Sequence, residues 1–304
     1  MARWAAKAVV QKGITFLPRR AHHPVNGLLQ RYVTRGTVLS DVLLQRRLAV
    51  ARIHRDAGAI AYAQPVLELG TGWYPIVPLS LFLAGFEQVG TIDLVSHANP
   101  GRSGMIASRL LAMHDVGDLE PILGALDDER VGRLRAALTG PVGEPKLDLQ
   151  GLGIQVLVGD ASSLRFADRS IGLISSNNVF EHIYPEVLGH ILEEFRRVLR
   201  DDGVMSHVVD MSDHFAHVDH SITPYNFLKF SDRQWRFIDN SIQPQSRLRV
   251  DDYRGLVRRM GFQVLSEKTK GHGLDVLRSV KLAERFRRKS EEDNEVTSWQ
   301  FSAN

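Results

Sequence analysis

Cysteine is absent from the 304-residue sequence, and this absence excludes several kinds of chemistry. The chain cannot form disulfide bonds, use a thiolate nucleophile or bind zinc through cysteine ligands. Such a composition fits a reducing compartment, so we expect a cytoplasmic protein. Long apolar segments are also missing, because no run approaches the roughly 20 residues that a membrane-spanning helix needs. The length and a hydrophobic fraction of 43% suit one large α/β domain with additions.

Acidic residues are scarce at the N-terminal end. Residues 1–55 contain 11 lysines and arginines but a single acid, Asp41, which gives this segment a net charge of +10. The whole chain carries +3, so residues 56–304 carry −7. A basic end on an acidic body indicates an anionic partner, although a solvated basic face has the same composition. Peripheral contact with an anionic membrane surface is one such interaction, and we do not expect a nucleic-acid partner.

Serine is missing from residues 1–39, which argues against a mitochondrial presequence even though the start of the chain is basic. We therefore treat residues 1–60 as a basic helical extension of a main domain that covers residues 61–304. The apolar spacing within the extension predicts helices over residues 1–17, 25–32 and 37–62.

The main domain is organised around Pro65–Trp73, with the sequence P-V-L-E-L-G-T-G-W. Its first half suits a buried strand, Gly70 and Gly72 follow, and an apolar helical segment begins at Pro75. This order is typical of nucleotide-binding α/β units, because glycine lets the backbone approach a ligand and a helix N-terminus offers free N–H groups. Proline at position 75 departs from the dinucleotide-binding pattern, which requires a third glycine there.

Glu68 lies two residues before this turn, and E-x-G-x-G at the end of a first strand resembles motif I of the class I S-adenosylmethionine (SAM) methyltransferases. The resemblance implies that Glu68, Gly70, Thr71 and Gly72 hold the methionine and ribose part of SAM. The third glycine of the fuller motif falls at Tyr74, so the match is partial. A glycine turn that only packs a strand on a helix is the alternative interpretation.

Two further acids follow strand-like segments. Asp93 lies in the predicted strand Gln88–Leu94, 21 positions after the second glycine. A carboxylate there can accept hydrogen bonds from both ribose hydroxyls, or it is an acidic turn residue. After the predicted strand Ile154–Val158, the resemblance implies that Asp160 accepts a hydrogen bond from the adenine amino group. It also implies that the backbone N–H near Ala161 meets a ring nitrogen.

The predicted fourth strand, Ser170–Ser176, continues into N-N-V-F-E-H. The pattern D-x-S-I-x-L-I-S-S-N-x-V-F-E-H-I resembles the fourth-strand motif of the same family, which implies that Asn177 contacts the cofactor. The carboxyl ends of parallel strands face the ligand cleft, so His182 is expected near the reacting methyl group or the cofactor carboxylate. A helix-start histidine bonded to backbone is the alternative.

Histidine and aspartate gather within eleven residues after the predicted fifth strand, Val204–Val209. Such a cluster can supply a general base, bind a divalent ion or merely bond to backbone, and the sequence leaves these three interpretations open. We take His214, His220, His182 and Asp213 as the catalytic candidates and assign no metal ligand. The cluster comprises Asp210, Asp213, His214, His217, Asp219 and His220.

The remaining segments complete a Rossmann-like arrangement. Residues 99–153 are predicted to form a helical insertion, and insertions of this size usually carry specificity or an interface. Further along, the sequence predicts a tight turn at Asp201–Gly203, a helix over Leu274–Lys289 and a final strand over Glu295–Ala303. The resemblance implies an α/β fold with a seven-stranded sheet in the order 3-2-1-4-5-7-6, the last strand being antiparallel.

Together these signals predict a class I SAM-dependent methyltransferase in which residues 1–60 form a lid over the substrate. The His/Asp cluster favours an oxygen acceptor in a small molecule, a saccharide or a lipid-linked compound. An NAD-dependent oxidoreductase would share the strand, turn and Asp93, but Pro75 and Asp160 disfavour it. A non-catalytic nucleotide-binding protein would keep the turn and need no base. The sequence does not set the oligomeric state.

Overall fold

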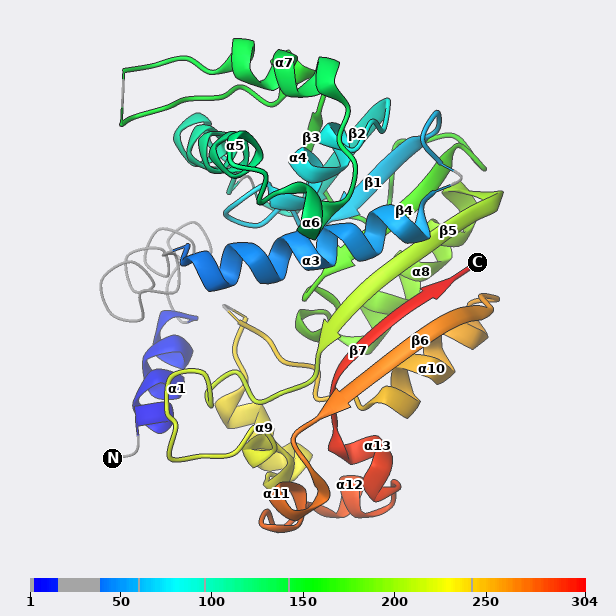
Figure 1. Ribbon diagram of the computed structural model, residues 1–304. Helices are drawn as coiled ribbons and strands as arrows, with labels where there is room; N and C mark the ends of the chain where they lie inside the picture. The colour runs from blue at the N-terminus through cyan, green and yellow to red at the C-terminus, as the bar shows by residue number, and fades with distance from the viewer. Residues whose placement is uncertain (1–2, 16–38, 60, 96, 142, 242) are drawn as a thin grey trace.

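The computed structural model describes residues 3–15, 39–59, 61–95, 97–141, 143–241 and 243–304 (Figure 1). The helix expected over residues 25–32 lies outside these ranges. None of the helices in the described ranges is long and apolar enough to cross a membrane.

Seven strands form one sheet in the order β3-β2-β1-β4-β5-β7-β6. Strands β1 to β5 pair in parallel, and β7 lies antiparallel between β5 and β6. This topology confirms the predicted fold. The strands are β1 (Pro65–Leu69), β2 (Gln88–Asp93), β3 (Gln155–Val158), β4 (Ile171–Asn177), β5 (Leu199–Asp210), β6 (Val264–Gly271) and β7 (Val296–Ala303).

Helices cover both faces of the sheet, with α3 and α4 on one face and α8 and α10 on the other (Figure 1). Neighbouring residues of β1 point to opposite faces, so Val66 packs with the first pair of helices and Leu67 with the second. The helices are α1 (Arg3–Ile14), α3 (Asp41–Ala57), α4 (Ile76–Leu83), α5 (Pro100–Asp115), α6 (Glu120–Leu123), α7 (Asp128–Ala137), α8 (Pro185–Val198), α9 (Asp232–Ile238), α10 (Val250–Arg259), α11 (Leu274–Arg278), α12 (Glu284–Arg287) and α13 (Glu291–Glu295), with the short 3-10 helices η2 (Gln150–Leu152), η3 (Phe180–His182) and η4 (Asn226–Lys229).

The predicted tight turn at Asp201–Gly203 is wrong, because these residues lie within β5. Helix α8 ends at Val198, and the backbone is already extended at Leu199, which pairs with Ile171 of β4. The register shifts just after this pair, so the additional residues are accommodated as an irregularity of the strand rather than as a turn. A Cβ at Gly203 would lie only 3.0 Å from the carbonyl oxygen of Ile171, which favours glycine there.

The predicted single helix over Leu274–Lys289 is also wrong, because the chain forms two short helices, α11 and α12. Leu277 and Phe286 are both fully buried in the same apolar cluster. A continuous helix turns about 100° per residue and would place these two side chains on opposite sides. The chain is instead extended at Ala283, whose N–H donates to the carbonyl of Leu228 at 2.9 Å.

Helix α1 packs on the segment that follows β5. Ala8 is buried in the same cluster as Phe215, and the backbone N–H of Trp4 donates to Asp219 at 3.0 Å. Lys12 donates from Nζ to two backbone carbonyls of the α9 region. The described beginning of the chain is therefore attached to the segment where the sequence gathers histidine and aspartate.

Helix α3 is part of the main core. Leu44, Leu48 and Ala51 form its buried face, and these side chains contact α4 and the sheet. Near its end, fully buried His54 places Nδ1 2.8 Å from the hydroxyl of Ser206 on β5. Burial lowers the pKa of His54 to about 3, so this imidazole is neutral in the folded protein.

His54 should make the folded protein sensitive to acid. The unfolded chain gains a proton at this residue near pH 6.5, whereas the folded chain stays neutral down to about pH 3. The stabilisation is therefore complete above pH 6.5 and is lost as the pH falls from 6.5 toward 3, by up to about 1.4 kcal/mol per pH unit. Between pH 6.5 and 5, the wild-type unfolding free energy in urea should fall by about 2 kcal/mol more than that of His54→Gln.

Exposed His190 on α8 provides the matched control, and His190→Gln should follow the wild-type pH dependence. Equal slopes for the wild type and His54→Gln would contradict the assignment of a neutral buried imidazole.

Candidate functional site

The glycine turn after β1 has the backbone that its sequence requires. Gly70 and Gly72 have φ angles of +87° and +60°, which glycine adopts readily. A Cβ at Gly70 would lie 2.5 Å from a methyl group of Val179, whereas a Cβ at Gly72 would meet nothing within 4 Å. Gly70 thus allows the turn to pack on the exit of β4, and Gly72 borders open space that a ligand can occupy.

Asp93 lies directly beside this turn. Its Oδ2 accepts a hydrogen bond from the Gly72 N–H at 3.1 Å, and the side chain is partly exposed at the end of β2. The hydroxyls of buried Thr71 and Thr91 are 2.6 Å apart, and Thr91 also donates to Glu68 at 3.2 Å. These bonds hold the ends of β1 and β2 together and leave the second carboxylate oxygen of Asp93 available to a ligand.

Asp160 and Ala161 follow β3 at the same edge of the sheet. The Gly159 N–H donates to the carbonyl of Asp93 at 3.0 Å, which brings the ends of β2 and β3 together. Asp160 is exposed, and its Oδ1 accepts hydrogen bonds from both the N–H and the hydroxyl of Ser162. The sequence-predicted cofactor residues therefore come together at the carboxyl ends of β1, β2 and β3.

Arg47 of α3 reaches this edge and was not among the predicted site residues. It donates to the carbonyl of Asn177 at 3.4 Å, and burial lowers its pKa while the charges of Glu68 and Glu181 raise it. Burial raises the pKa of Glu68 to about 8. The hydrogen bond from Thr91 and the positive charge of Arg47 lower this pKa but only partly offset the effect of burial. The sequence could have indicated that Arg47 points toward the interior, because position 47 falls on the same helical face as the buried positions 44 and 51.

Asn177 stands at the end of β4 and is 7% exposed. Within the described part of the chain its Nδ2 has no hydrogen-bond partner. A buried donor of this kind is costly unless a ligand or water accepts from it. Together with the open space at Gly72 and the second oxygen of Asp93, it gives a polar edge whose donors and acceptors can bind a nucleoside with an amino-acid tail.

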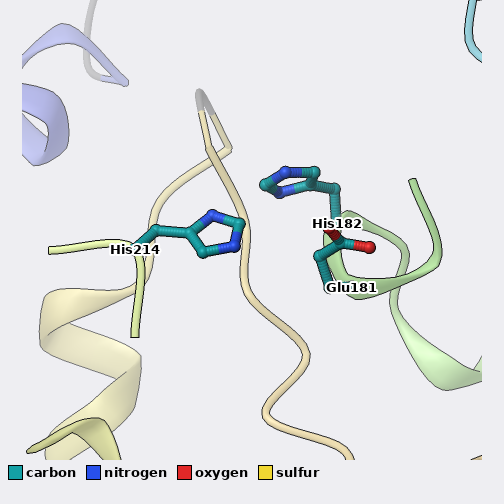
Figure 2. A group of neighbouring side chains, drawn as sticks. All are labelled: Glu181, His182 and His214. Atoms are coloured by element: carbon teal, nitrogen blue, oxygen red, sulfur yellow. The ribbon is translucent and has the colours of Figure 1, made fainter. Parts of the chain in front are cut away.

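A second group of polar side chains lies where η3 and the end of β5 meet, and Figure 2 shows Glu181, His182 and His214 within it. The rings of His182 and His214 are 4.9 Å apart in an edge-on arrangement. Asp210 places Oδ2 3.7 Å from Nε2 of His214 and 3.9 Å from Nε2 of His217. We call these five residues the histidine–carboxylate cluster.

Both inner imidazoles of the cluster are neutral. Burial, followed by the charge of His182, holds the pKa of His214 well below its usual range, and burial also lowers the pKa of His182. Nδ1 of His182 lies 2.7 Å from the carbonyl of Pro244, which can only accept, so Nδ1 carries the proton. The lone pair of His182 therefore resides on Nε2. Burial and the negative charge of Asp210 raise the pKa of Glu181 well above its usual range.

The other catalytic candidates lie apart from this cluster. Asp213 is fully buried, and its two oxygens accept from the Phe215 N–H at 2.8 Å and the Asn226 amide at 3.1 Å. Burial raises its pKa to about 6. Asp210, rather than Asp213, faces His214. His220 is exposed beside Asp219, and in the described ranges the structure does not bring it into the cluster.

A cavity of about 470 Å³ lies between α3, α5 and the region of α6. Its walls include Asp41, Leu44, Arg109 and Met113, and none of the sequence-predicted site residues lines it. The polar edge at the strand ends is therefore the better candidate for chemistry, because perturbed titratable groups converge there.

Comparison with known proteins agrees with this geometry. The sequence pattern of a methyltransferase domain matches residues 139–206, which include β3, β4 and most of β5. No curated protein sequence matches the chain. Among solved structures, the chain is similar to the PH0226 protein from Pyrococcus horikoshii, with a TM-score of 0.50 and 13% identity over 87% of this chain and 92% of that one.

Two further solved structures resemble the chain at lower TM-scores. A geranyl diphosphate C-methyltransferase from Streptomyces coelicolor has a TM-score of 0.45 and 12% identity, covering 85% of this chain and 79% of that one. A putative sarcosine dimethylglycine methyltransferase from Galdieria sulphuraria has a TM-score of 0.44 and 15% identity, covering 85% of this chain and 84% of that one. At these identities the likeness concerns the fold.

The strand order with an antiparallel β7 is the Rossmann-like order that the sequence predicted, and the methyltransferase-domain pattern matches part of the same sheet. The fold and this match support an SAM-dependent methyltransferase, with SAM as the expected cofactor. The residues at the ends of β1 to β4 fit this cofactor, because they combine open glycine backbone with unused acceptors and donors.

Asp93 should make a large contribution to cofactor affinity. Asp93→Ala removes an ionised acceptor placed for both ribose hydroxyls, and we expect weaker SAM binding by roughly 2–4 kcal/mol in calorimetry. Asp93→Asn keeps an acceptor for the Gly72 N–H and should lose less. Glu87→Ala, at an exposed residue just before the opposite end of the strand, is the matched control and should bind SAM like the wild type. Unchanged affinity in Asp93→Ala would refute this placement of the ribose.

Proposed function

We propose that the chain transfers a methyl group from SAM to a hydroxyl oxygen of a small-molecule, saccharide or lipid-linked acceptor at the histidine–carboxylate cluster. One observation carries this proposal. Two neutral imidazoles, His182 and His214, lie with Asp210 at the exits of β4 and β5, beside the strand ends that suit the cofactor. Hydroxyl acceptors need a group that can take their proton, and this cluster is suited to that task.

When bound, SAM supplies an activated methyl group whose carbon–sulfur bond breaks as the carbon–oxygen bond to the acceptor forms. The chain has to hold the acceptor hydroxyl in line and keep water away. His214 is only 7% exposed, so a proton taken from the acceptor there is not readily exchanged with bulk water. The Asp210 carboxylate, 3.7 Å from His214, stabilises the imidazolium that would form, and His217 leads from Asp210 to solvent.

The imidazole at position 214 should be required for turnover. His214→Ala removes the candidate proton acceptor, and we expect methyl transfer to fall on the order of 100- to 10,000-fold while SAM affinity is retained. Transfer of radiolabelled methyl groups to saccharide, lipid and metabolite extracts measures this, with calorimetry for SAM binding. His220→Ala should keep wild-type turnover, because this histidine is exposed and outside the cluster. Full activity in His214→Ala would remove this histidine from the mechanism.

We further propose that the basic N-terminal residues recruit an acceptor that is itself anionic or lies at an anionic surface. The net charge of +10 on residues 1–55 supports this. Some of these cations have internal partners, since Lys12 binds carbonyls near α9, Arg52 pairs with Asp56 and Arg55 binds the carbonyl of Leu123. The positive charge that attracts the anionic acceptor or surface would therefore come from the other basic residues of 1–55.

Recruitment by charge should be sensitive to salt. Binding to vesicles that contain anionic lipid should weaken as salt rises, because exposed charges are screened over about 8–10 Å near physiological ionic strength. Cosedimentation at low and high salt measures the effect, with neutral vesicles as the control. Binding that is equal at both salt concentrations would contradict the proposal.

A further inference from the structure

Three side chains of the histidine–carboxylate cluster converge on one point. Glu181 and His182 come from η3, which follows β4, and His214 comes from the segment that follows β5 (Figure 2). A ring nitrogen of each histidine and a carboxylate oxygen of the glutamate all lie within 4.8 Å of one another. Because β4 and β5 are neighbours in the sheet, the fold itself holds these residues together.

Glu181 lacks the partners that a buried carboxylate normally has. It is 4% exposed, and within the described ranges neither of its oxygens accepts a hydrogen bond of normal geometry, although the backbone N–H groups of Glu181 and Asp210 lie near enough to favour its charged form. Arg47 contributes positive charge nearby but makes no hydrogen bond to Glu181 among the described contacts. A buried, unpaired carboxyl group is costly, and coordination of a cation removes that cost.

His182 is oriented as a metal-bound imidazole usually is. Its Nδ1–H donates to the carbonyl of Pro244 at 2.7 Å, which fixes the ring and leaves the Nε2 lone pair free. Metal-binding histidines almost always donate their second N–H to such an oxygen. This hydrogen bond also fixes the ring of His182 in an edge-on arrangement with the ring of His214.

We propose that Glu181, His182 and His214 bind a divalent transition-metal ion of the zinc type. Two imidazole nitrogens and one carboxylate oxygen suit Zn²⁺, Mn²⁺ or Co²⁺, whereas Mg²⁺ prefers oxygen ligands alone. In a tetrahedral site with bonds of about 2.1 Å, ligand atoms lie about 3.4 Å apart. The observed grouping lies within 4.8 Å, so binding requires the three side chains to rotate closer together. Asp210, next to both His214 and Glu181, adds negative charge behind the ligands.

Three protein ligands leave a coordination position open, which is typical of catalytic rather than structural zinc sites. Resting on the proposed function, this position takes the hydroxyl oxygen of the acceptor. A metal ion lowers the pKa of an oxygen that it binds, so the hydroxyl proton leaves through Asp210 and exposed His217 to solvent. The imidazoles then serve as ligands instead of proton acceptors. The acceptor class is a compound with a hydroxyl group that can bind a metal.

Direct metal binding tests the site without reference to activity. Protein treated with chelator and then dialysed should bind one Co²⁺ per chain, with the visible absorption of a low-symmetry Co²⁺ site, and Zn²⁺ should displace it in calorimetry. His182→Ala, His214→Ala and the nearly isosteric Glu181→Gln should each weaken binding by roughly 100-fold or more. SAM affinity, measured on every variant, reports that the fold is intact. His190→Ala, at an exposed site on α8, is the matched control and should bind metal like the wild type.

The outcomes separate this inference from the proposed function. Metal binding that is absent in the wild type, or unchanged in all three variants, would overturn the site. Methyl transfer that persists undiminished in chelator-treated protein would also overturn it, while the methyltransferase proposal stands. Stoichiometric binding that depends on the three residues, without transfer to any hydroxyl acceptor, would establish the site and refute O-methylation instead.

Discussion

The positive charge of Arg47 lies near two buried carboxyl groups, Glu68 and Glu181, and its side chain donates a hydrogen bond to the carbonyl of Asn177 at the end of β4. Glu68 is the penultimate residue of β1, beside the cofactor turn, and Glu181 belongs to η3 beside the imidazoles. Arg47 comes from α3, whose neighbouring turns are held in the core by Leu44 and Leu48. Removing this positive charge would leave both buried carboxyl groups with less electrostatic compensation. One residue from outside the central sheet therefore places its charge beside both the cofactor edge and the cluster.

The sheet explains why two kinds of chemistry meet at one edge. Parallel strands direct their carboxyl ends to the same side, so β1, β2 and β3 bring the nucleoside-binding groups together while β4 and β5 bring the histidines. The segment after β5 would otherwise be a long polar loop. It is fixed by the hydrogen bonds of Asp213 to Phe215 and Asn226, and helix α1 packs over it. Asp213 therefore supports the backbone that presents His214.

Most of the fold could be predicted from the sequence, because buried segments such as β1 and β4 end in glycine or a polar residue, and the motifs at their ends resemble those of a known family. The backbone of the glycine turn and its hydrogen bond to Asp93 could also be anticipated, since Gly70, Gly72 and Asp93 depend on local conformation and fixed spacing, while their role in binding SAM stays a prediction. The errors arose where local pattern competes with tertiary packing. Leu277 and Phe286 each suit a helix, yet burying both in one cluster breaks it. The spacing of apolar residues along the sequence does not reveal that both side chains must be buried in the same cluster.

The histidine–carboxylate cluster was only partly predictable for a different reason. His182, His214 and Asp210 all stood out as polar residues at strand exits, but their pairing depends on distances between segments. Glu181 lay inside the recognised fourth-strand motif, and its burial without hydrogen-bond partners becomes visible only in three dimensions. A charged residue on a buried helical face, such as position 47, is the one signal that sequence reading could have used.

The close packing of Gly70 against Val179 has a thermodynamic consequence. Since there is no room for even one additional carbon atom between them, the cofactor turn is in direct contact with the exit of β4. Val179 immediately precedes η3, so a ligand that shifts Glu181 or His182 enough to move Val179 would also alter this contact. The free energies of binding at the two places are then linked, and reciprocity requires that each ligand alter the other's affinity by the same factor.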